Sequence, residues 1–371
     1  MNKKTIVFLR SNPVNPDSRV EKEANSLAKA GYNVTILAWD RDSNYRVNKE
    51  ELKLNESTAT IYRRGLKASF GEGIKNIIPF IRFQLFLFFW LTNNKKKYDI
   101  IHACDFDTCF TARLSTLFTR KKYIFDIFDY LSTDAITFPK KIIKKLEDSL
   151  INSAMATIIC TEERKKQIKD TKPKKLVVIH NTPQMYHGEE IKKHSKIKVA
   201  YVGILQEYRM ILEIVNVIKE MKEIELHIGG FGKLEKEIKE IADRNSNIIY
   251  YGRLSYNDTL KLENNCDIMT AIYDPKIGNH KFAAPNKFYE ALMLGKPLIM
   301  VKNTGMSDVV QENNIGICID FTAESFKNGL IELIDRKNEW QEISSKMKKI
   351  YNETYSWNVM EKRLLELYKN I

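Results

Sequence analysis

Short apolar segments alternate with amphipathic segments along almost the whole chain, and this alternation limits the folds that the chain can adopt. Each unit is predicted to contain a buried strand, a helix and a second strand. The predicted units are 5–9, 19–30 and 33–38; 99–102, 108–118 and 123–128; and 198–203, 212–221 and 225–228. Helical crossovers between strands join them in parallel, so the pattern predicts an α/β protein with doubly wound sheets.

The chain has 371 residues, which is enough for two domains of ordinary size. Residues 181–195 are polar and irregular, and they separate the second unit from the third. We therefore predict an interdomain linker there. Residues 357–368 form an amphipathic pattern, which predicts a terminal helix.

The net charge of +13 predicts an anionic partner, which could be a nucleotide, an acidic lipid surface or a nucleic acid. Nucleic acid is the weakest of the three, because no recognisable nucleic-acid module accompanies the lysines. The five cysteines are scattered and mostly lie in apolar runs, which is typical of reduced, buried cysteines in a cytosolic protein. Only five uncharged residues separate Lys4 from Arg10, too few for a secretory signal, so this segment is predicted as a first strand.

Residues 284–299 carry the most specific functional signal. They predict a loop, a helix that starts after Pro285 and stops at Gly295, and a buried strand. A helix N-terminus with Lys287 in its first turn suits a diphosphate, and Glu290 could accept hydrogen bonds from a ribose diol. The alternative is an ordinary helix start in an α/β domain.

This stretch resembles the C-terminal signature of nucleotide-sugar glycosyltransferases of the GT-B fold, especially the retaining glycosyltransferase family four (group 1 glycosyltransferases). Other segments resemble the same family in the right order: 17–24 with 30–34, 101–105, 178–181 and 251–254. The resemblance implies two Rossmann-like domains that face each other across a cleft. It implies an acceptor domain over 1–183, a donor domain over 184–354, and a C-terminal helix, 355–371, that crosses back to the first domain.

The second domain contains further candidate donor residues. Gly230-Phe231-Gly232 after a strand partly matches a dinucleotide fingerprint, but its third position is Glu235, which argues against an oxidoreductase. The resemblance instead implies that this turn lies near the donor diphosphate, together with Asn286 and Lys287. It also implies that Arg209, six residues after Gly203, faces the diphosphate, although a solvated arginine at a helix start is the alternative.

In the first domain, Asp105-Phe106-Asp107 imitates the Asp-x-Asp metal motif of another glycosyltransferase fold. Helix capping, or lining of the cleft, is the better interpretation, because acidic residues at a strand end also cap helices. We therefore expect no metal, and we place Asp105 near the acceptor as a catalytic candidate together with Arg209. Arg19 is a second, weaker candidate for the diphosphate.

Three positions depart from the family pattern. Phe282 replaces the first glutamate of the Glu-x7-Glu motif, Cys104 replaces a cleft histidine, and Phe128 replaces another. If these apolar side chains face the donor sugar, they predict a donor with fewer hydroxyls, such as a 6-deoxy sugar. The alternative is that they are ordinary core residues.

The sequence therefore predicts a glycosyltransferase that needs no cofactor and uses a UDP-, GDP- or dTDP-linked sugar. The expected acceptor is lipid-linked or a glycan, in cell-surface polysaccharide or glycolipid synthesis. A non-catalytic partner subunit that binds a glycan or a catalytic homologue is the main alternative. An epimerase of the same fold is a weaker one, because polar groups expected around its sugar are missing.

Residues 77–91 are the most hydrophobic stretch of the chain, but they are too few to span a bilayer and they contain Arg82 and Gln84. Lysines flank them at Lys75 and at 95–97, and a second basic cluster covers 140–145. This combination predicts a cytoplasmic protein that binds peripherally to the inner face of the cell membrane through acidic lipid. The alternative is a helix packed inside the first domain.

Overall fold

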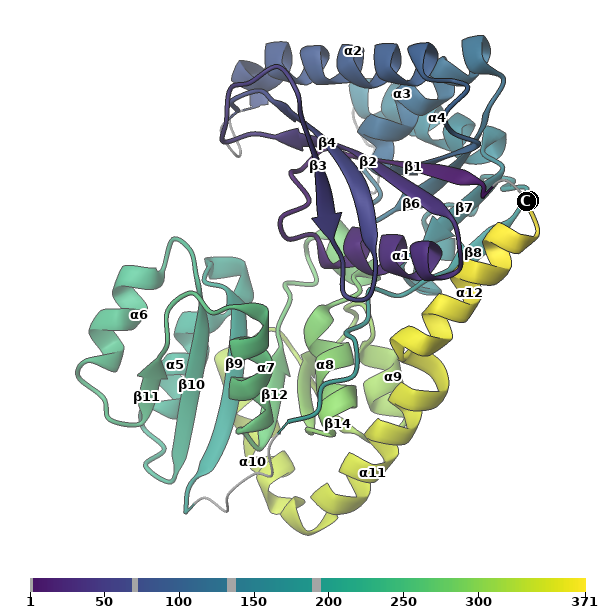
Figure 1. Ribbon diagram of the computed structural model, residues 1–371. Helices are drawn as coiled ribbons and strands as arrows, with labels where there is room; N and C mark the ends of the chain where they lie inside the picture. Colours follow the sequence, from purple (N-terminus) through teal and green to yellow (C-terminus); the bar gives the residue numbers. More distant parts are fainter. Residues whose placement is uncertain (1–2, 69–72, 132–137, 189–194) are drawn as a thin grey trace. The chain divides into compact units, whose positions relative to one another are not determined.

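A computed structural model describes residues 3–68, 73–131, 138–188 and 195–371 (Figure 1). The chain divides into two compact units. The first unit contains residues 1–180 and 361–371, and the second contains residues 181–360.

In the described part of the first unit, the strands form one eight-stranded sheet in the order β3-β4-β2-β1-β5-β6-β7-β8. Its strands are β1 (Thr5–Arg10), β2 (Asn33–Asp40), β3 (Asn48–Lys53), β4 (Thr58–Gly65), β5 (Ile100–Cys104), β6 (Lys122–Ile127), β7 (Ala156–Ile159) and β8 (Leu176–Val178). All neighbours pair in parallel except β3 and β4. The strand order reverses between β1 and β5, so loops at their carboxyl ends diverge there and leave room for a ligand.

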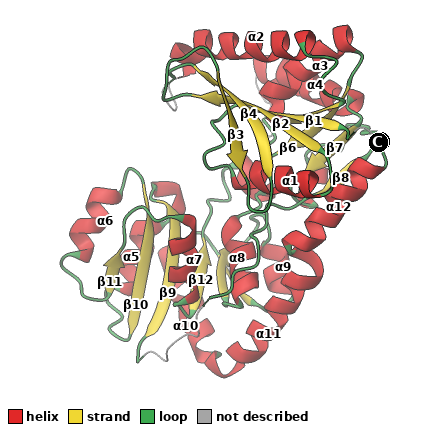
Figure 2. Ribbon diagram, viewed as in Figure 1, coloured by secondary structure: helices red, strands yellow, loops and turns green. Residues whose placement is uncertain are grey.

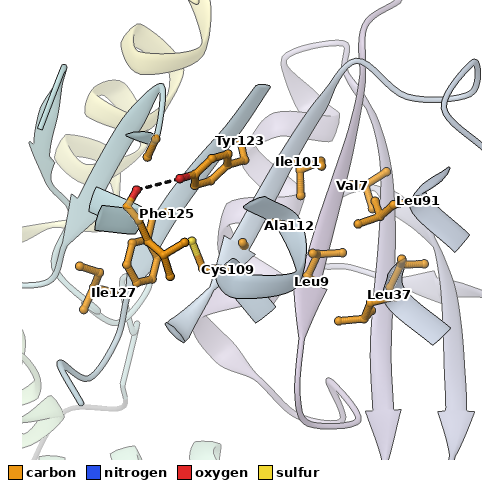
Figure 3. Packing of buried hydrophobic residues seen from close by; sticks show 14 of the residues in the cluster. Val7, Leu9, Leu37, Leu91, Ile101, Cys109, Ala112, Tyr123, Phe125 and Ile127 are labelled. Carbon is orange, nitrogen blue, oxygen red and sulfur yellow. Dashed lines mark hydrogen bonds between the residues drawn. The ribbon is translucent and has the colours of Figure 1, made fainter. Parts of the chain in front are cut away.

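Helices cover both faces of this sheet (Figure 2). They are α1 (Ser18–Lys29), α2 (Ile77–Asn93), α3 (Asp105–Thr119), α4 (Phe138–Ser153) and the end of α12 (Trp357–Lys369), with short turns η1 (Gly73–Asn76) and η2 (Glu163–Lys166). Leu9 of β1 and Leu91 of α2 belong to one buried cluster with Phe125 of β6 (Figure 3). In the same cluster Tyr123 donates a hydrogen bond to the Leu150 carbonyl at 2.8 Å. Phe8, between the inward Val7 and Leu9, points to the other face and stacks on His102.

The described strands of the second unit form a six-stranded parallel sheet in the order β11-β10-β9-β12-β13-β14. Its strands are β9 (Ile197–Ile204), β10 (Ile224–Phe231), β11 (Ile248–Tyr250), β12 (Ile268–Ala271), β13 (Leu298–Val301) and β14 (Gly316–Ile319). The order reverses between β9 and β12, which is the dinucleotide-fold arrangement.

Two apolar clusters, one on each face, stabilise the second sheet, because neighbouring residues of β9 belong to different clusters. Val199 packs with α5 (Ile211–Ile218), α6 (Glu235–Ala242) and α10 (Ala323–Asp335). Ala200 packs with α7 (Tyr256–Asn264), α8 (Asn286–Leu294), α9 (Ser307–Glu312) and α11 (Trp340–Ile350). Short helical turns complete the unit: η3 (Glu207–Arg209), η4 (Gly278–Phe282), η5 (Lys337–Glu339) and η6 (Tyr351–Tyr355).

The predicted fold class, an α/β protein with two Rossmann-like doubly wound domains, is confirmed. One local prediction was wrong. The strand expected to end at residue 228 continues as β10 to Phe231, and Gly230, expected in the turn after it, still pairs with Gly203 of β9. The antiparallel β3–β4 pair was also missed, since β3 is a charged edge strand with little apolar alternation.

Candidate functional site

The carboxyl ends of β9 and β12 meet at the point where the second sheet reverses its order, and the glycines there allow a close backbone approach. Gly230 has φ +149°, and a Cβ atom on it would lie 1.9 Å from the Gly203 carbonyl oxygen. Only glycine fits that position. At Gly203 nothing lies within 4 Å of where a Cβ would be, so space beside this strand end is open.

Arg209 ends η3, shortly after β9, and its guanidinium lies against residues that follow β12. The guanidinium carbon is 3.7 Å from the ring centroid of Tyr273, and Nη1 donates to the Ile272 carbonyl at 3.4 Å. Stacking of this kind holds an arginine fork in one orientation while its remaining N–H groups stay available.

His280 of η4 completes this cluster of basic and aromatic side chains. Its ring is edge-on to Tyr273 at 5.1 Å, and Nδ1 donates to the Asp274 carbonyl at 2.9 Å. Sequence reasoning identified Arg209 but missed Tyr273 and His280. Their position in the sequence could have identified them, because both follow β12, a strand at the reversal of the sheet order, where ligands bind in such folds.

The first turn of α8 carries a compact ionic cluster. Lys287 Nζ lies 2.7 Å from Glu263 Oε1 and 2.7 Å from Glu290 Oε2, and both carboxylates are buried. Burial and the charge of Glu290 raise the pKa of Glu263 to about 8, although Lys287 opposes the shift. Burial disfavours the Lys287 charge, but the two carboxylates outweigh it and raise the pKa of that ammonium. Burial and the nearby carboxylates raise the pKa of Tyr256, and a hydrogen bond from Tyr256 to Glu290 raises it further.

This geometry constrains the predicted donor roles. Lys287 directs two of its three N–H donors at carboxylates, which leaves one for a ligand. Glu290 is 1% exposed, so a ribose would compete with Lys287 and Tyr256 for its oxygens. Asn286, at the helix start, accepts a hydrogen bond from the Asn181 side chain at 3.3 Å. The donor roles of Asn286, Lys287 and Glu290 stay predictions, and sequence reasoning missed Glu263.

In the first unit, Asp105 follows β5 at the sheet reversal and pairs with Arg10, the last residue of β1. Arg10 Nη1 lies 2.5 Å from Asp105 Oδ2, and the backbone amides of Phe128 and Asp129 donate to Oδ1 at 3.0 and 3.2 Å. The carboxylate therefore bonds to the loop after β6, and Cys104, the N-cap residue of α3, makes no side-chain capping hydrogen bond. Burial raises the pKa of Asp105 to about 6, against the opposing effect of Arg10. Sequence reasoning missed Arg10.

Phe128 contacts two guanidinium groups. The Arg10 and Arg19 guanidinium carbons are 4.2 and 4.6 Å from its ring centroid. A histidine here would place a titratable ring close to two cations. The phenylalanine instead offers both of them an electron-rich face.

Arg19 lies inside the first unit, where it is 2% exposed. It donates to Asp126 at 2.6 and 3.2 Å and to the Ile179 carbonyl at 2.9 Å, and its Nε is 3.3 Å from Glu23. These contacts give Arg19 a structural role and leave almost none of it exposed for a diphosphate.

His102 joins the same buried network. Its Nε2 lies 3.3 Å from Asp126 Oδ2, and its Nδ1 lies 2.7 Å from the Tyr368 hydroxyl. Burial lowers the pKa of His102, while Arg19 and His102 outweigh burial and lower the pKa of Asp126. The neutral imidazole therefore carries its proton on Nε2, and Tyr368 donates to Nδ1.

Cys104 is fully buried, and burial raises the pKa of its thiol. It forms, with His102 and Asp126, the one close trio of possible metal ligands among the residues that the structure describes. His102 and Asp126 already have the hydrogen-bond partners just described. Among the described residues, both carboxylate oxygens of the neighbouring Glu23 are buried without a hydrogen-bond partner. Phe282, the third departure, ends η4 and is half-buried.

Two doubly wound sheets, each with candidate residues where its strand order reverses, are the architecture of the GT-B fold. Two family sequence models match adjacent parts of the chain. The model described as "Glycosyltransferase Family 4" matches residues 18–182, and the model described as "Glycosyl transferases group 1" matches residues 184–350. Together they cover most of its length. The chain belongs to the group 1 glycosyltransferases.

Solved structures show the same fold at low sequence identity. Sucrose-phosphate synthase from Thermosynechococcus elongatus is 12% identical with a TM-score of 0.76, and the match covers 99% of each chain. HepE from Anabaena, in complex with UDP-glucose, is 12% identical with a TM-score of 0.69 over 99% of this chain and 100% of that one. A glycosyltransferase from Rickettsia africae is 13% identical with a TM-score of 0.68 over 100% and 99%. No curated protein sequence matches the chain.

Proposed function

We propose that this glycosyltransferase moves a sugar from a UDP-, GDP- or dTDP-linked donor to a lipid-linked or glycan acceptor. The observation that carries the donor assignment is the stacked Arg209–Tyr273–His280 cluster at the reversal between β9 and β12. The complex of Anabaena HepE with UDP-glucose, in a protein of the same fold, supports a nucleotide sugar as the ligand.

The proposed reaction proceeds with retention. The bond between the anomeric carbon and the diphosphate oxygen breaks, the acceptor oxygen bonds to that carbon, and the acceptor proton passes to the departing diphosphate. Arg209 and the first turn of α8 neutralise the leaving group, so the protein contributes mainly positioning and electrostatics. Asp105, held by Arg10 and two backbone amides, orients the acceptor. No metal or cofactor takes part in this proposal.

The setting we propose is cell-surface polysaccharide or glycolipid synthesis, on the cytoplasmic face of the membrane. We also propose that the donor lacks a hydroxyl, as a 6-deoxy sugar does. Cys104 is fully buried, so it cannot face the donor sugar. The proposal of a 6-deoxy sugar therefore depends on Phe282 and Phe128, which are both partly exposed. Turnover that favours a fully hydroxylated hexose over its 6-deoxy analogue would contradict it.

The test of donor binding is calorimetry with UDP, GDP, dTDP and their sugar conjugates. One of these should bind, and Arg209→Ala should weaken it by about tenfold or more, because a charge-assisted contact contributes about 1.5–3 kcal/mol. Arg244→Ala is the matched control, since Arg244 is exposed in the same unit and lies after α6. Unchanged affinity in Arg209→Ala would remove that residue from the donor site.

A non-catalytic partner subunit is the second candidate, and one observation favours it. Lys287 pairs with both Glu290 and Glu263, so part of the expected donor site is occupied by its own side chains. Nucleotide-sugar binding without transfer or donor hydrolysis would support this alternative.

A further inference from the structure

Two neighbouring helices of the first unit expose long apolar stripes. On α3 the stripe is formed by Phe110, Leu114, Leu117 and Phe118, the last two being 62% and 64% exposed. On α2 it is formed by Ile77, Ile78, Ile81, Leu85 and Phe89. Apart from the adjacent pairs Ile77–Ile78 and Leu117–Phe118, the members of each set are three to four residues apart, so each set lies on one side of its helix.

The two stripes belong to adjoining helices. Gln84 of α2 accepts a hydrogen bond from Thr111 of α3 at 2.5 Å, and the rings of Phe88 and Phe118 meet edge to face at 5.5 Å. The opposite side of α2, with Phe83 and Leu87, is buried in the core of the unit. Figure 1 shows the two helices, and we call their exposed apolar surface the α2–α3 face.

A basic cavity adjoins the carboxyl end of α3. Its volume is about 460 Å³, and its basic lining residues are Arg113, Lys121, Lys122 and Lys174. The other lining residues are Thr116, Tyr123, Ser153 and Met155. None of the lining residues is acidic, but Asp99 Oδ1 lies 3.9 Å from Lys121 Nζ. Arg113 lies one turn before Leu117, so the basic cavity and the apolar stripe share a helix. Three more exposed lysines, residues 95–97, follow the end of α2.

A bilayer that contains acidic phospholipid matches this combination in both respects. Its acyl boundary accepts apolar side chains, and its phosphates attract lysine and arginine. Large contiguous apolar patches are rare on soluble monomers and usually mark an interaction surface. A second copy of the chain fits less well, because two basic cavities would be brought together. Within the described residues, the helices are all too short or too polar to cross a bilayer.

We propose that the α2–α3 face docks on an acidic phospholipid surface and that the cavity of Arg113, Lys121, Lys122 and Lys174 receives a lipid phosphate. This docking proposal rests on the membrane location given under the proposed function. It adds which surface of the protein binds the membrane and which class of lipid is bound. Docking can be measured without sugar transfer, so either proposal can fail alone.

The test is co-sedimentation of the full chain with vesicles of phosphatidylcholine alone or with added phosphatidylglycerol, at low and high salt. The protein should bind the acidic vesicles, and less so at high salt. Lys121→Gln with Lys122→Gln should weaken binding about 30-fold, because each basic residue at an acidic surface contributes about 1 kcal/mol. Leu117→Ser with Phe118→Ser should weaken it at least tenfold.

Matched controls come from the second unit. Lys236→Gln with Lys239→Gln removes two exposed lysines of α6, and Ile331→Ser removes an exposed apolar residue of α10. Both should bind vesicles like the unmodified chain, and circular dichroism should show that every variant is folded.

Equal binding to neutral and acidic vesicles would overturn the role of the cavity. Unchanged binding of the Leu117 and Phe118 variant would overturn the role of the face. Protein that stays in the supernatant with every vesicle type would refute docking. If analytical ultracentrifugation then shows that this protein is a dimer, the face would be assigned to self-association. Vesicle binding by a chain that binds no nucleotide would leave the docking proposal standing and refute the donor proposal.

Discussion

Replacement of Glu263 by glutamine should remove a pH dependence from the stability of the protein. Glu263 is fully buried, and its pKa is raised from the ordinary 4.5 to about 8 by burial and by Glu290. Between these two values the folded chain holds a proton that the unfolded chain has lost. The free energy of unfolding therefore falls as the pH rises, by about 1.36 kcal/mol for each pH unit.

From pH 5 to pH 8 this loss amounts to about 4 kcal/mol in the unmodified chain. Glu263→Gln keeps the shape of the side chain and an oxygen that can accept from Lys287, but it cannot ionise. Lys287 also keeps Glu290 as its counter-ion. The variant should therefore match the unmodified chain near pH 5 and exceed its stability by several kcal/mol at pH 8.

Urea unfolding at pH 5, 6, 7 and 8, followed by circular dichroism and tryptophan fluorescence, measures this difference. Other buried carboxyls also titrate, so the informative quantity is the slope of the variant minus that of the unmodified chain. Glu237→Gln, on the exposed side of α6, is the control and should leave the slope unchanged. Parallel curves for Glu263→Gln and the unmodified chain would show that Glu263 does not take up a proton on folding.

Three further predictions concern single contacts. Glu290→Ala should lower nucleotide affinity at least about tenfold in calorimetry, because two charge-assisted bonds to a ribose are lost, while Glu263→Gln should retain it. Unchanged affinity of Glu290→Ala would contradict the ribose assignment. Gly230→Ala should lower the thermal midpoint by several degrees, because its Cβ would overlap the Gly203 carbonyl oxygen, and an unchanged midpoint would show that β10 shifts freely. Tyr368→Phe should destabilise the chain in urea by about 1–3 kcal/mol, because buried His102 Nδ1 loses its donor, and equal stability would mean that water replaces the hydroxyl.

Much of the fold could be predicted, because apolar residues recur at regular intervals in its helices and strands and because glycines mark where helices end. Gly295 ends α8 in a left-handed conformation, and Gly31 follows α1 in the same way, as their positions in the sequence indicate. The strand β3 could not be predicted, because it is stabilised by pairing with β4 and not by its own apolar residues.

The candidate site was harder to predict, because its arrangement depends on contacts between distant residues. Lys287 was recognised from its position in a helix start, but its pairing with Glu263 is a contact between α7 and α8 that no local pattern encodes. Arg19 carried the charge expected of an anion ligand, yet Asp126, far along the chain, holds it inside the first unit. Charge and position indicate which residues can bind a phosphate, whereas burial decides which of them are available.

The hydrogen bond between Tyr368 and His102 also affects the order in which the protein can mature during synthesis. The ribosome makes His102 early, but Tyr368 emerges only after the entire second unit has been translated. Until then the network of Arg19, Asp126 and His102 lacks the residue that satisfies Nδ1. The first unit is thus the first to be synthesised and the last to be completed. A truncation that removes the final turn of α12 would damage residues at the opposite end of the sequence.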